Sequence, residues 1–369
     1  MSNNSARRLI HIISSNSWGG REQYALDLCR SLLQRKWSIS VYTRNALAVD
    51  QHFISNAIDL RHIPLGGFFD LISIWSLSRD FLKEQKSTIV HVHNYKDALI
   101  AILARKLCRR TSDIRIVMTR HKATAGIDSW LFNKIYRNLD AHIFVSKLAK
   151  HQFLTTWQNK QLPFSEEKLF MLHNSILSAP TAPDSEPVGG PKIAMFHGRL
   201  SPEKGVETII EALPKLRDKK IRLWIIGSGD PDYVDSLKHK ALALDVMDMI
   251  DWKGYVEDVH SFISLCHYGI LPSIWQEPFG LSNIEYMSHG KPQICTNNGA
   301  QSEYLTEDKE AIFVSPGDSD AMADAMILLT ENADLRKEIG NAAFQKFQSE
   351  LSWDKFCNKI EHIYSSLLD

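Results

Sequence analysis

Short apolar runs alternate with helical patterns or loop signals along the whole chain. In the first half the runs are LIHIIS, SISVYT, TIVHVH, IRIVMT, AHIFVS and LFMLH. In the second half they are KIAMFHG, RLWIIG, MIDWKG, YGILPS, PQICT and AIFVS. Short apolar runs separated by helical segments are typical of βα units with parallel strands. The pattern therefore predicts an α/β fold of two doubly wound, Rossmann-like domains.

A segment rich in Pro and Gly, LSAPTAPDSEPVGGP, separates the two halves. This composition is typical of an interdomain linker, and we assign residues 181–191 to it. The predicted domains are residues 1–180 and residues 192–351. The remaining residues, 352–369, carry apolar side chains at helical spacing and predict an amphipathic helix. Because open sheets bind ligands at the carboxyl ends of their strands, we expect a site in a cleft between the domains.

The net charge of zero hides an asymmetry between the halves. Residues 1–180 carry 25 Lys and Arg against 13 Asp and Glu, and residues 181–369 carry 18 against 30. The densest basic stretch runs from Arg105 to Lys122. It is either a solvated face or a surface that attracts an anionic membrane or a phosphate-bearing substrate. It lacks interleaved aromatic residues, which disfavours a nucleic-acid partner.

The five cysteines are widely spaced and contain no C-x-x-C pair. This favours buried thiols in a reducing cytosol over a disulfide or zinc framework. The chain has no run of eighteen apolar residues, so no spanning helix is expected. The N-terminal residues read as a first strand rather than a signal peptide. The predicted location is cytoplasmic.

Two strand-to-helix segments carry features suited to a phosphate ligand. In SNSWGGREQ, Gly19 and Gly20 allow a tight turn that brings backbone N–H groups to a ligand, although a plain turn explains them equally well. In FHGRLSPEKG, Arg199 and Lys204 stand at the entry to a helix. Two cations beside free helix N–H groups can bind a diphosphate without metal. The alternative is a capping turn with two surface cations.

Histidines and paired aspartates raise the question of a metal. His91 and His93 alternate on one strand and share a face, and with His121 they have the ligand types of a zinc site. Buried core histidines are the alternative, and His121 closes a strand where an imidazole can contact substrate. Two D-x-D pairs, in GSGDPDY and SPGDSDAM, can hold a divalent ion but are typical of turns and helix N-caps. We predict no bound metal.

The segment WQEPFGLSNIEYM contains two carboxylates, Glu277 and Glu285. Ser282 and Glu285 have the spacing of a capping box, in which each side chain binds a backbone amide of the helix start. Gly280 favours exposure of backbone N–H groups to a ligand. Glu277 precedes it in a loop, where a carboxylate can accept hydrogen bonds from vicinal hydroxyls. The pair is thus a cap and a loop carboxylate, or part of a sugar site.

Taken together, the motifs are more specific than any one of them. GRLSPEKG, GSGD, GYVEDV, LPSIWQEPFGLSNIEYMSHGKP and TNNGAQSEYL occur in the order and at the spacing of one family, as do GG-x-E, HVHN, TRH and the final SWDKF helix. Over essentially its whole length, the chain resembles the retaining family-4 glycosyltransferases of the GT-B fold. The resemblance implies an N-terminal acceptor domain that the last helix rejoins, and a C-terminal nucleotide-sugar domain.

The resemblance also implies roles for individual residues. Glu277 and His121 contact the transferred sugar and form the catalytic set. The donor-binding residues are Gly19, Gly20, Arg199, Lys204, Val256, Phe279, Gly280, Leu281 and Glu285. Of these, Glu285 binds the ribose, the backbone of Val256 contacts the base, and Arg199 and Lys204 neutralise the diphosphate. Arg21 and His93 are predicted to contact the acceptor. No cofactor is implied; the donor is a nucleoside diphosphate sugar, with a UDP-sugar slightly favoured.

The acceptor is a carbohydrate or lipid-linked hydroxyl, as in lipopolysaccharide, surface polysaccharide or glycolipid synthesis. Residues 66–86 are rich in aromatic and basic residues and form either a membrane-facing amphipathic helix or a helix packed on the sheet. We hypothesise peripheral attachment to an anionic inner leaflet. The alternatives are a sugar-nucleotide-binding protein without turnover, a hydrolase with a metal on His91, His93 and His121, and a phosphorylase or a synthase with a soluble sugar phosphate acceptor.

Overall fold

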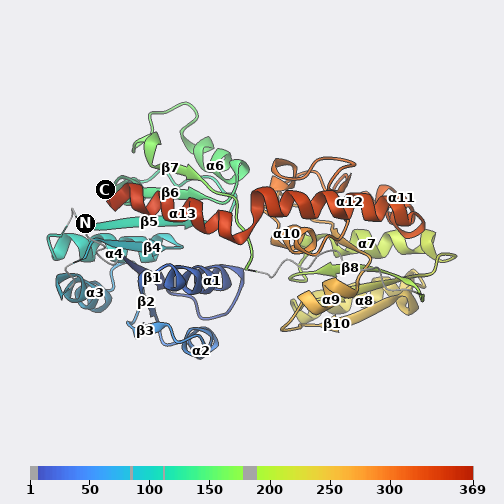
Figure 1. The fold of residues 1–369 in the computed structure, drawn as a ribbon, viewed down its shortest axis with the longest axis horizontal. Coiled ribbons are helices and arrows are strands. Elements are labelled where there is room, and N and C mark those ends of the chain that lie inside the picture. The colour runs from blue at the N-terminus through green and yellow to red at the C-terminus, as the bar shows by residue number, and fades with distance from the viewer. Residues whose placement is uncertain (1–6, 84–85, 111–112, 178–188, 369) are drawn as a thin grey trace. The chain divides into compact units, whose positions relative to one another are not determined.

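The computed structural model describes residues 7–83, 86–110, 113–177 and 189–368. It divides into two compact units, Met1–His173 with Asp354–Asp369 and Asn174–Trp353. Each unit holds one parallel sheet with helices on both faces, as Figure 1 shows. The predicted α/β class with two Rossmann-like domains is confirmed. Most of the predicted linker lies outside the described residues, and the cleft between the domains stays a prediction.

The N-terminal unit is built on seven parallel strands in the order β3-β2-β1-β4-β5-β6-β7. Their bounds are β1 Arg8–Ile13, β2 Ser38–Thr43, β3 Asp59–His62, β4 Thr88–Val92, β5 Ile114–Arg120, β6 Ala141–Phe144 and β7 Leu169–Met171. After β1, the next two strands are added on one side of it, out to β3 at the edge, and β4 then pairs with β1 on its other side. The strand order therefore reverses between β1 and β4, which is where ligands bind in doubly wound sheets.

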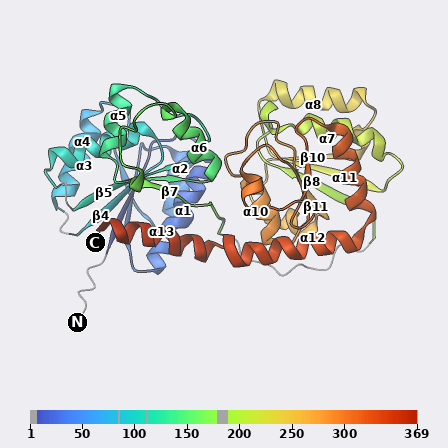
Figure 2. The same cartoon turned by 90° about the horizontal axis from the view of Figure 1, so that it is seen from above.

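Helices cover both faces of this sheet. They are α1 Gly20–Gln34, α2 Leu47–Ser55, α3 Leu71–Lys83, α4 Tyr95–Leu107, α5 Trp130–Asn138, α6 Lys147–Leu154 and the last helix, α13 Trp353–Leu368. Figure 2 shows α3, α4 and α5 on one side of the sheet and α1 with α13 on the other. The final segment forms the predicted amphipathic helix. Its Tyr364 is fully buried and its hydroxyl lies 2.6 Å from Nδ1 of His91, on β4.

The C-terminal unit has six parallel strands in the order β10-β9-β8-β11-β12-β13. Their bounds are β8 Lys192–His197, β9 Ile221–Ile226, β10 Ile250–Gly254, β11 Tyr268–Leu271, β12 Gln293–Thr296 and β13 Ile312–Val314. The helices are α7 Val206–Ala212, α8 Pro231–Ala243, α9 His260–Leu265, α10 Leu281–Ser288, α11 Ser319–Glu331 and α12 Ala333–Lys346. Here the order reverses between β8 and β11.

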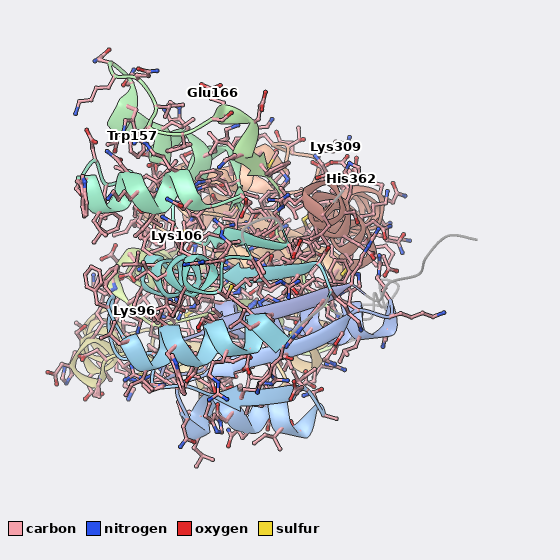
Figure 3. All side chains as sticks on the ribbon, turned by 90° about the vertical axis from the view of Figure 1, so that its left-hand side faces the viewer. Lys96, Lys106, Trp157, Glu166, Lys309 and His362 are labelled. Carbon is pink, nitrogen blue, oxygen red and sulfur yellow. The ribbon has the colours of Figure 1, made fainter. Side chains whose placement is uncertain are left out.

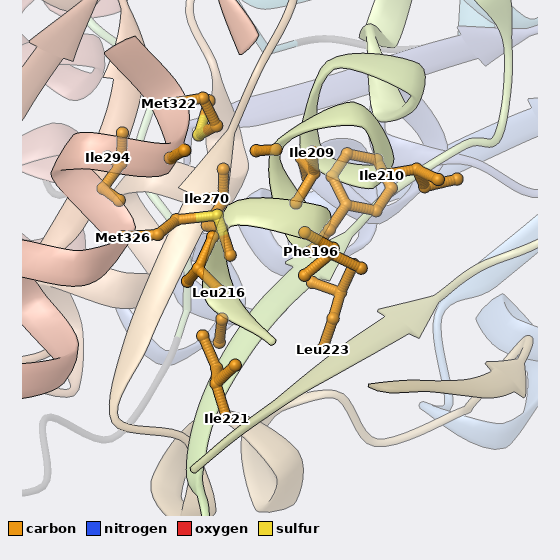
Figure 4. Close-up of a cluster of buried hydrophobic side chains, with 14 of the residues drawn as sticks. Phe196, Ile209, Ile210, Leu216, Ile221, Leu223, Ile270, Ile294, Met322 and Met326 are labelled. Atoms are coloured by element: carbon orange, nitrogen blue, oxygen red, sulfur yellow. The ribbon is translucent and has the colours of Figure 1, made fainter. Parts of the chain in front are cut away.

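The core of the C-terminal unit lies between its sheet and the helices α7 and α11. Phe196 of β8 and Ile270 of β11 are fully buried with Ile209 of α7 and Met326 of α11, as Figure 4 shows. Burying such side chains contributes about 1.5–3 kcal/mol each. This packing fixes the direction of β8 and β11, and with it the positions of the loops that follow them.

The two D-x-D pairs serve as helix caps. The Asp230 carboxylate accepts hydrogen bonds from the backbone N–H groups of residues 232 and 233 at the start of α8. The Asp318 carboxylate accepts one from Ala321 N at the start of α11. All five cysteines are free and buried, as predicted.

Candidate active site

The predicted donor residues of the C-terminal unit lie in loops at the carboxyl ends of β8 and β11, the two strands that flank the reversal of strand order. Backbone hydrogen bonds join these loops to each other and to the loop after β12. Ile274 N donates to Glu203 O at 3.1 Å, and Ala300 N donates to Glu277 O at 2.9 Å. The loops are therefore fixed relative to one another at the position where a doubly wound sheet binds its ligand.

Lys204 and Glu277 form an ion pair between the ammonium Nζ and the carboxylate Oε1. Ser273 Oγ donates to the same oxygen at 2.9 Å, and Glu277 is only 4% exposed. A carboxylate this buried needs a cation and hydrogen bonds to remain stable. Its other oxygen, Oε2, makes no hydrogen bond to the described residues. Lys204 is predicted to neutralise the diphosphate and Glu277 to contact the sugar, and the structure brings the two side chains into direct contact.

Lys204 lies in a 3₁₀ turn, Pro202–Lys204, and the following helix begins only at Val206. Between them, Gly205 has φ +66°, and a Cβ there would lie 2.2 Å from Pro272 O. Only glycine fits that position. Arg199, from the same loop, is exposed and forms no ion pair with the described residues. The structure therefore joins Lys204, but not Arg199, to the loop after β11.

Phe279, Gly280 and Leu281 lie at the start of α10. Gly280 is its N-cap, with φ +84°. The Tyr304 hydroxyl donates to Phe279 O at 2.5 Å and so holds the loop carbonyl within the protein. The first N–H groups of a helix lack intrahelical partners and favour anions. Tyr304 was not predicted as a functional residue, because nothing in the sequence indicates that residue 304 returns to this loop.

The predicted capping box at Ser282 and Glu285 is wrong. α10 begins at Leu281 after Gly280, so Ser282 is already inside the helix, and no side chain caps its start. Ser282 Oγ instead donates to His197 O at 3.1 Å. Glu285 Oε2 lies 2.5 Å from Nε2 of His197, the last residue of β8.

Hydrogen-bond counting assigns the protons around Glu285. The Tyr286 hydroxyl donates its one proton to Met195 O at 2.8 Å, so His197 Nδ1, 2.8 Å from that hydroxyl, must be the donor to it. His197 Nε2 then faces the carboxylate with a second proton, as an imidazolium. Burial alone would raise the pKa of Glu285, but the His197 charge and hydrogen bond hold the pKa below its ordinary value. His197 lies at the end of a predicted strand, and this position is the one feature of the sequence that could have indicated it as a functional residue.

Val256 follows β10 and is partly buried. It packs against a small cluster that contains Met195, Ile226 and Tyr286. Tyr286 also bonds to His197, so this cluster continues to the side chain that pairs with Glu285. The role predicted for the Val256 backbone, contact with the base, stays a prediction.

In the N-terminal unit, the Gly19–Gly20 segment differs from the predicted tight turn. Gly19 is extended, with φ −169°, and Gly20 is the first residue of α1. Glu22 is the residue that organises this loop, although no role was predicted for it. Its Oε1 accepts hydrogen bonds from Ser15 Oγ at 2.6 Å and from Arg21 Nε at 2.8 Å. The glutamate of the GG-x-E motif therefore fixes the guanidinium of Arg21.

The histidines of this unit form a connected cluster. His93 Nδ1 lies 3.1 Å from His121 Nε2, and His93 Nε2 lies 3.2 Å from His11 Nδ1. His91 instead contacts two hydroxyls, those of Thr119 and Tyr364. Among the described residues, the ring nitrogens that lie close enough to share one ion are those of His11, His91 and His93. The set in the metal-hydrolase alternative, which included His121, is therefore not the one that the structure brings together.

This cluster predicts acid sensitivity. Burial lowers the pKa of His11 and His121 to about 3, and the pKa values of His91 and His93 also lie well below normal. The unfolded chain then binds more protons below about pH 6.5, so the free energy of unfolding falls as the pH falls, by up to about 1.4 kcal/mol per pH unit for each histidine. We expect the urea midpoint to fall steeply from pH 7.5 to pH 5.5. A constant midpoint would contradict the neutral cluster.

Two buried acids of the same unit have the opposite effect on the pH dependence of stability. Burial raises the pKa of Asp27 and of Asp97 to about 6. Their contribution to stability grows as the pH falls, because the folded state then binds the extra proton. His142 of this unit also has a pKa lowered by burial to about 3, so five histidines with lowered pKa values oppose two aspartates with raised ones, and the loss of stability on acidification dominates.

Comparison with known proteins identifies the family. The model of the Glycosyl transferases group 1 matches residues 180–346, and the model of Glycosyltransferase Family 4 matches residues 18–176. The chain belongs to glycosyltransferase family 4. The two matched segments correspond to the two units of the structure, so the family accounts for both sheets.

One relative of this glycosyltransferase matches nearly the whole chain, and another matches about half of it. A phosphatidyl-myo-inositol mannosyltransferase of Mycobacterium leprae is 24% identical over 362 residues, which cover 95% of this chain and 93% of the relative. An uncharacterised glycosyltransferase of Methanocaldococcus jannaschii is 28% identical over 182 residues, but these span only 46% of that protein.

Solved structures show the same GT-B fold. A glycosyltransferase from Rickettsia africae has a TM-score of 0.85 at 19% identity, with 99% of both chains covered. Anabaena Alr3699/HepE, solved with UDP-glucose, has a TM-score of 0.81 at 17% identity, with 97% of this chain and 99% of that chain covered. The predicted family and fold are thus confirmed, and the enzyme is a glycosyltransferase. The roles predicted for its individual site residues stay predictions.

Proposed function

We propose that this glycosyltransferase moves a hexose-type sugar from a UDP-sugar to a hydroxyl acceptor, with retention of the anomeric configuration and without a metal. The observation that carries the proposal is the Lys204–Glu277 ion pair at the carboxyl ends of β8 and β11. An ammonium that can neutralise a diphosphate thus lies next to a carboxylate that can accept hydrogen bonds from sugar hydroxyls. The Anabaena protein of the same fold was solved with UDP and with UDP-glucose, which supports uridine as the base.

The chemistry follows from these groups. The bond between the anomeric carbon and the diphosphate oxygen breaks, and negative charge develops on the leaving oxygens. Lys204 and the N–H groups at the start of α10 stabilise that charge, which is the main source of acceleration in such sites. The acceptor oxygen attacks the same face of the sugar and gives its proton to the departing phosphate. Glu277 Oε2 and His121 hold the sugar hydroxyls.

The two acceptor contacts proposed in the N-terminal unit differ in their geometry. His93 is only 8% exposed, and both of its ring nitrogens already contact other histidines. The Arg21 side chain is 34% exposed and is fixed by Glu22. Arg21 is therefore the better placed of the two for an acceptor with a negative charge.

A donor panel tests the proposal. The protein is mixed with UDP-, GDP- and ADP-sugars, and the thermal shift and the release of nucleoside diphosphate are measured. We expect UDP and a UDP-hexose to raise the melting temperature and the UDP-hexose to be turned over with a suitable acceptor, in the presence of EDTA. Stabilisation by GDP or ADP alone would overturn the choice of base. Binding with no release for any acceptor tested would favour the binding-protein alternative.

We further propose that the acceptor is membrane-associated. The helix α3 buries Ile74, Leu77 and Phe81 against the sheet, which fits the prediction of a packed helix. Its other side and the preceding loop leave large apolar side chains exposed; this aromatic face consists of Phe68, Phe69, Leu71, Ile72 and Trp75. Such a face beside cations is suited to the interface of an anionic bilayer. Among the described residues, no helix is long and apolar enough to cross a membrane.

Cations border this face. The Arg79 guanidinium lies 4.7 Å from the Trp75 ring centroid, and Lys83 ends the same helix. On α5, Trp130 is 71% exposed with the Lys134 ammonium 3.9 Å from its ring centroid. Such amphipathic pairs anchor proteins at headgroup level.

The basic stretch from Arg105 to Lys122 offers fewer cations to an anionic membrane than its charge suggests. Four of its arginines bind groups of the protein itself: Arg105, Arg110, Arg115 and Arg120. Arg105, for example, is buried and lies 2.5 Å from Asp140. Lys106, labelled in Figure 3 on α4, is exposed. Neither reading of the stretch, as a solvated face or as an anion-binding surface, describes these arginines.

Liposome flotation checks the aromatic face. We expect the protein to float with vesicles that contain anionic lipid at low salt and to lose most of that binding in the variant Ile72→Ser/Trp75→Ser. Each buried apolar side chain contributes about 1.5–3 kcal/mol at the interface. The matched control is Leu242→Ser/Leu328→Ser, two exposed leucines of the C-terminal unit. Equal flotation of both variants, or no flotation of the wild type at any lipid composition, would contradict the proposal.

A further inference from the structure

Three imidazoles form a chain that runs from the middle of the N-terminal sheet to its carboxyl edge. His11 belongs to β1, His93 follows β4 and His121 follows β5. His11 Nδ1 lies 3.2 Å from His93 Nε2, and His93 Nδ1 lies 3.1 Å from His121 Nε2. The first two rings are buried and the third is half-buried. This histidine chain, formed by His11, His93 and His121, therefore connects the interior of the domain to the residue that the proposed function places on the sugar.

The direction of these hydrogen bonds is restricted. A neutral imidazole carries one N–H and one bare nitrogen, so each ring can donate on one side and accept on the other. Burial keeps the rings neutral, and the charge of nearby Arg21 adds to this at His93 and His121. With both hydrogen bonds made, the chain has only two arrangements: all N–H groups point outwards to His121, or all point inwards to His11.

The inner end of the chain decides between them. His11 Nε2 is buried and has no hydrogen-bond partner among the described residues. In the inward arrangement this atom would carry an N–H with no acceptor, whereas in the outward arrangement it is a bare lone pair. Orphaned buried N–H groups are the rarer and costlier of the two in proteins. The outward arrangement is therefore favoured: His11 donates to His93, and His93 donates to His121 Nε2.

The outer end is then fixed as well. Because His121 Nε2 accepts, its proton is on Nδ1, which has no hydrogen-bond partner among the described residues. The Tyr24 ring lies edge-on to His121, with centroids 5.1 Å apart and planes at 78°, and further restricts the ring. We propose that His93, whose Nε2 accepts from His11, is a positioning residue that holds His121 as the Nδ1–H tautomer, so that His121 offers a donor to an oxygen of the transferred sugar. This proposal rests on the proposed function.

Two variants of His93 and one matched control test the histidine chain. His93→Leu removes the donor to His121 Nε2, whereas His93→Asn keeps an amide N–H close to the position of Nδ1. His142→Leu is the control, since His142 is also buried in the same unit but bonds to Tyr136 O, outside the histidine chain. The tautomer of His121 is read from the ring ¹⁵N and ¹³Cδ2 chemical shifts of histidine-labelled protein, and kcat and KM are measured with the UDP-sugar that the donor panel selects.

We expect wild-type His121 to be the Nδ1–H tautomer, and His93→Leu to populate the Nε2–H tautomer. His93→Leu should lower kcat about tenfold with less than a twofold change in the KM for the donor, and His93→Asn should restore most of it. His142→Leu should lose stability without changing the tautomer or kcat. Equal losses of kcat in both His93 variants and in the control would overturn the proposal, because they would show a purely structural effect.

Other outcomes separate this proposal from the proposed function. An Nε2–H tautomer in the wild type would overturn the chain whatever the activity, as would one equivalent of zinc in the purified protein, held by His11, His91 and His93. The Nδ1–H tautomer in a protein that turns over no donor would support the chain and overturn the proposed function instead. Full activity of His121→Ala would overturn the role of the chain in transfer.

Discussion

Glu277→Gln is expected to lower kcat/KM for sugar transfer by about 10²–10³-fold. The substitution keeps the shape of the side chain but removes the charge that pairs with Lys204. The Lys204 ammonium is then freed from its partner, and the sugar hydroxyls lose a charged acceptor. Losing one preorganised group of this kind costs about 2.7–4 kcal/mol in the transition state. Steady-state kinetics with the UDP-sugar and acceptor measure the effect.

The matched control is Lys215→Ala, which removes an exposed ion pair with Asp320 from the same unit and should leave kcat/KM unchanged. The double variant Lys204→Ala/Glu277→Gln should lose much less than the product of the two single effects, because the residues act as one unit. Full activity of Glu277→Gln, or strictly multiplicative losses, would contradict the role proposed for the pair.

The fold was largely predictable because the parallel strands are buried on both faces. Apolar runs such as TIVHVH and KIAMFHG can be read directly from the sequence, and each forms a strand. The exception is β3, Asp59–His62, which the pattern missed. It lies at the edge of its sheet, where its side chains are half-buried or exposed, so no apolar run marks it.

Of the candidate site, the sequence predicted those residues that lie within a local motif. Glu277, Lys204 and Gly280 were found because each lies in a recognisable loop. Residues outside these motifs were missed, since His197 reaches Glu285 of α10, and Tyr304 reaches Phe279 of the loop, through the fold rather than through sequence spacing. A two-residue difference in where α10 starts, with Gly280 rather than Ser282 as the N-cap, is also enough to turn a capping box into a side-chain contact with another strand.

The same distinction applies in the N-terminal unit. The sequence pairs His91 with His93 because they alternate on one strand, but it gives no hint that His11 lies beside them. The parallel register of β1 and β4, which pairs His11 with His91, brings the third ring into the cluster. Register is a tertiary property, and a single sequence contains too little information to fix it.

Glu285→Gln and Glu285→Ala are expected to separate the two functions of this carboxylate. Alanine leaves the buried His197 imidazolium without its counter-charge, and we expect a loss of about 3 kcal/mol in the free energy of unfolding. Glutamine can donate an N–H to neutral His197 and should cost less than about 1 kcal/mol. Both variants lose the charge that we propose accepts hydrogen bonds from the ribose hydroxyls, so both should bind UDP about 10–100-fold more weakly. Urea unfolding and calorimetric titration with UDP measure the two quantities.

Glu338→Gln makes the same chemical change at an exposed position of α12 and should alter neither quantity. The Gln variant is decisive because it preserves the hydrogen bond to His197 and removes only the charge. If it bound UDP as tightly as the wild type, Glu285 would be a structural partner of His197 and not a ribose ligand. If instead Glu285→Ala unfolded no more easily than the wild type, His197 would be neutral, and the proton count that assigns an imidazolium from the Tyr286 and Met195 contacts would be wrong.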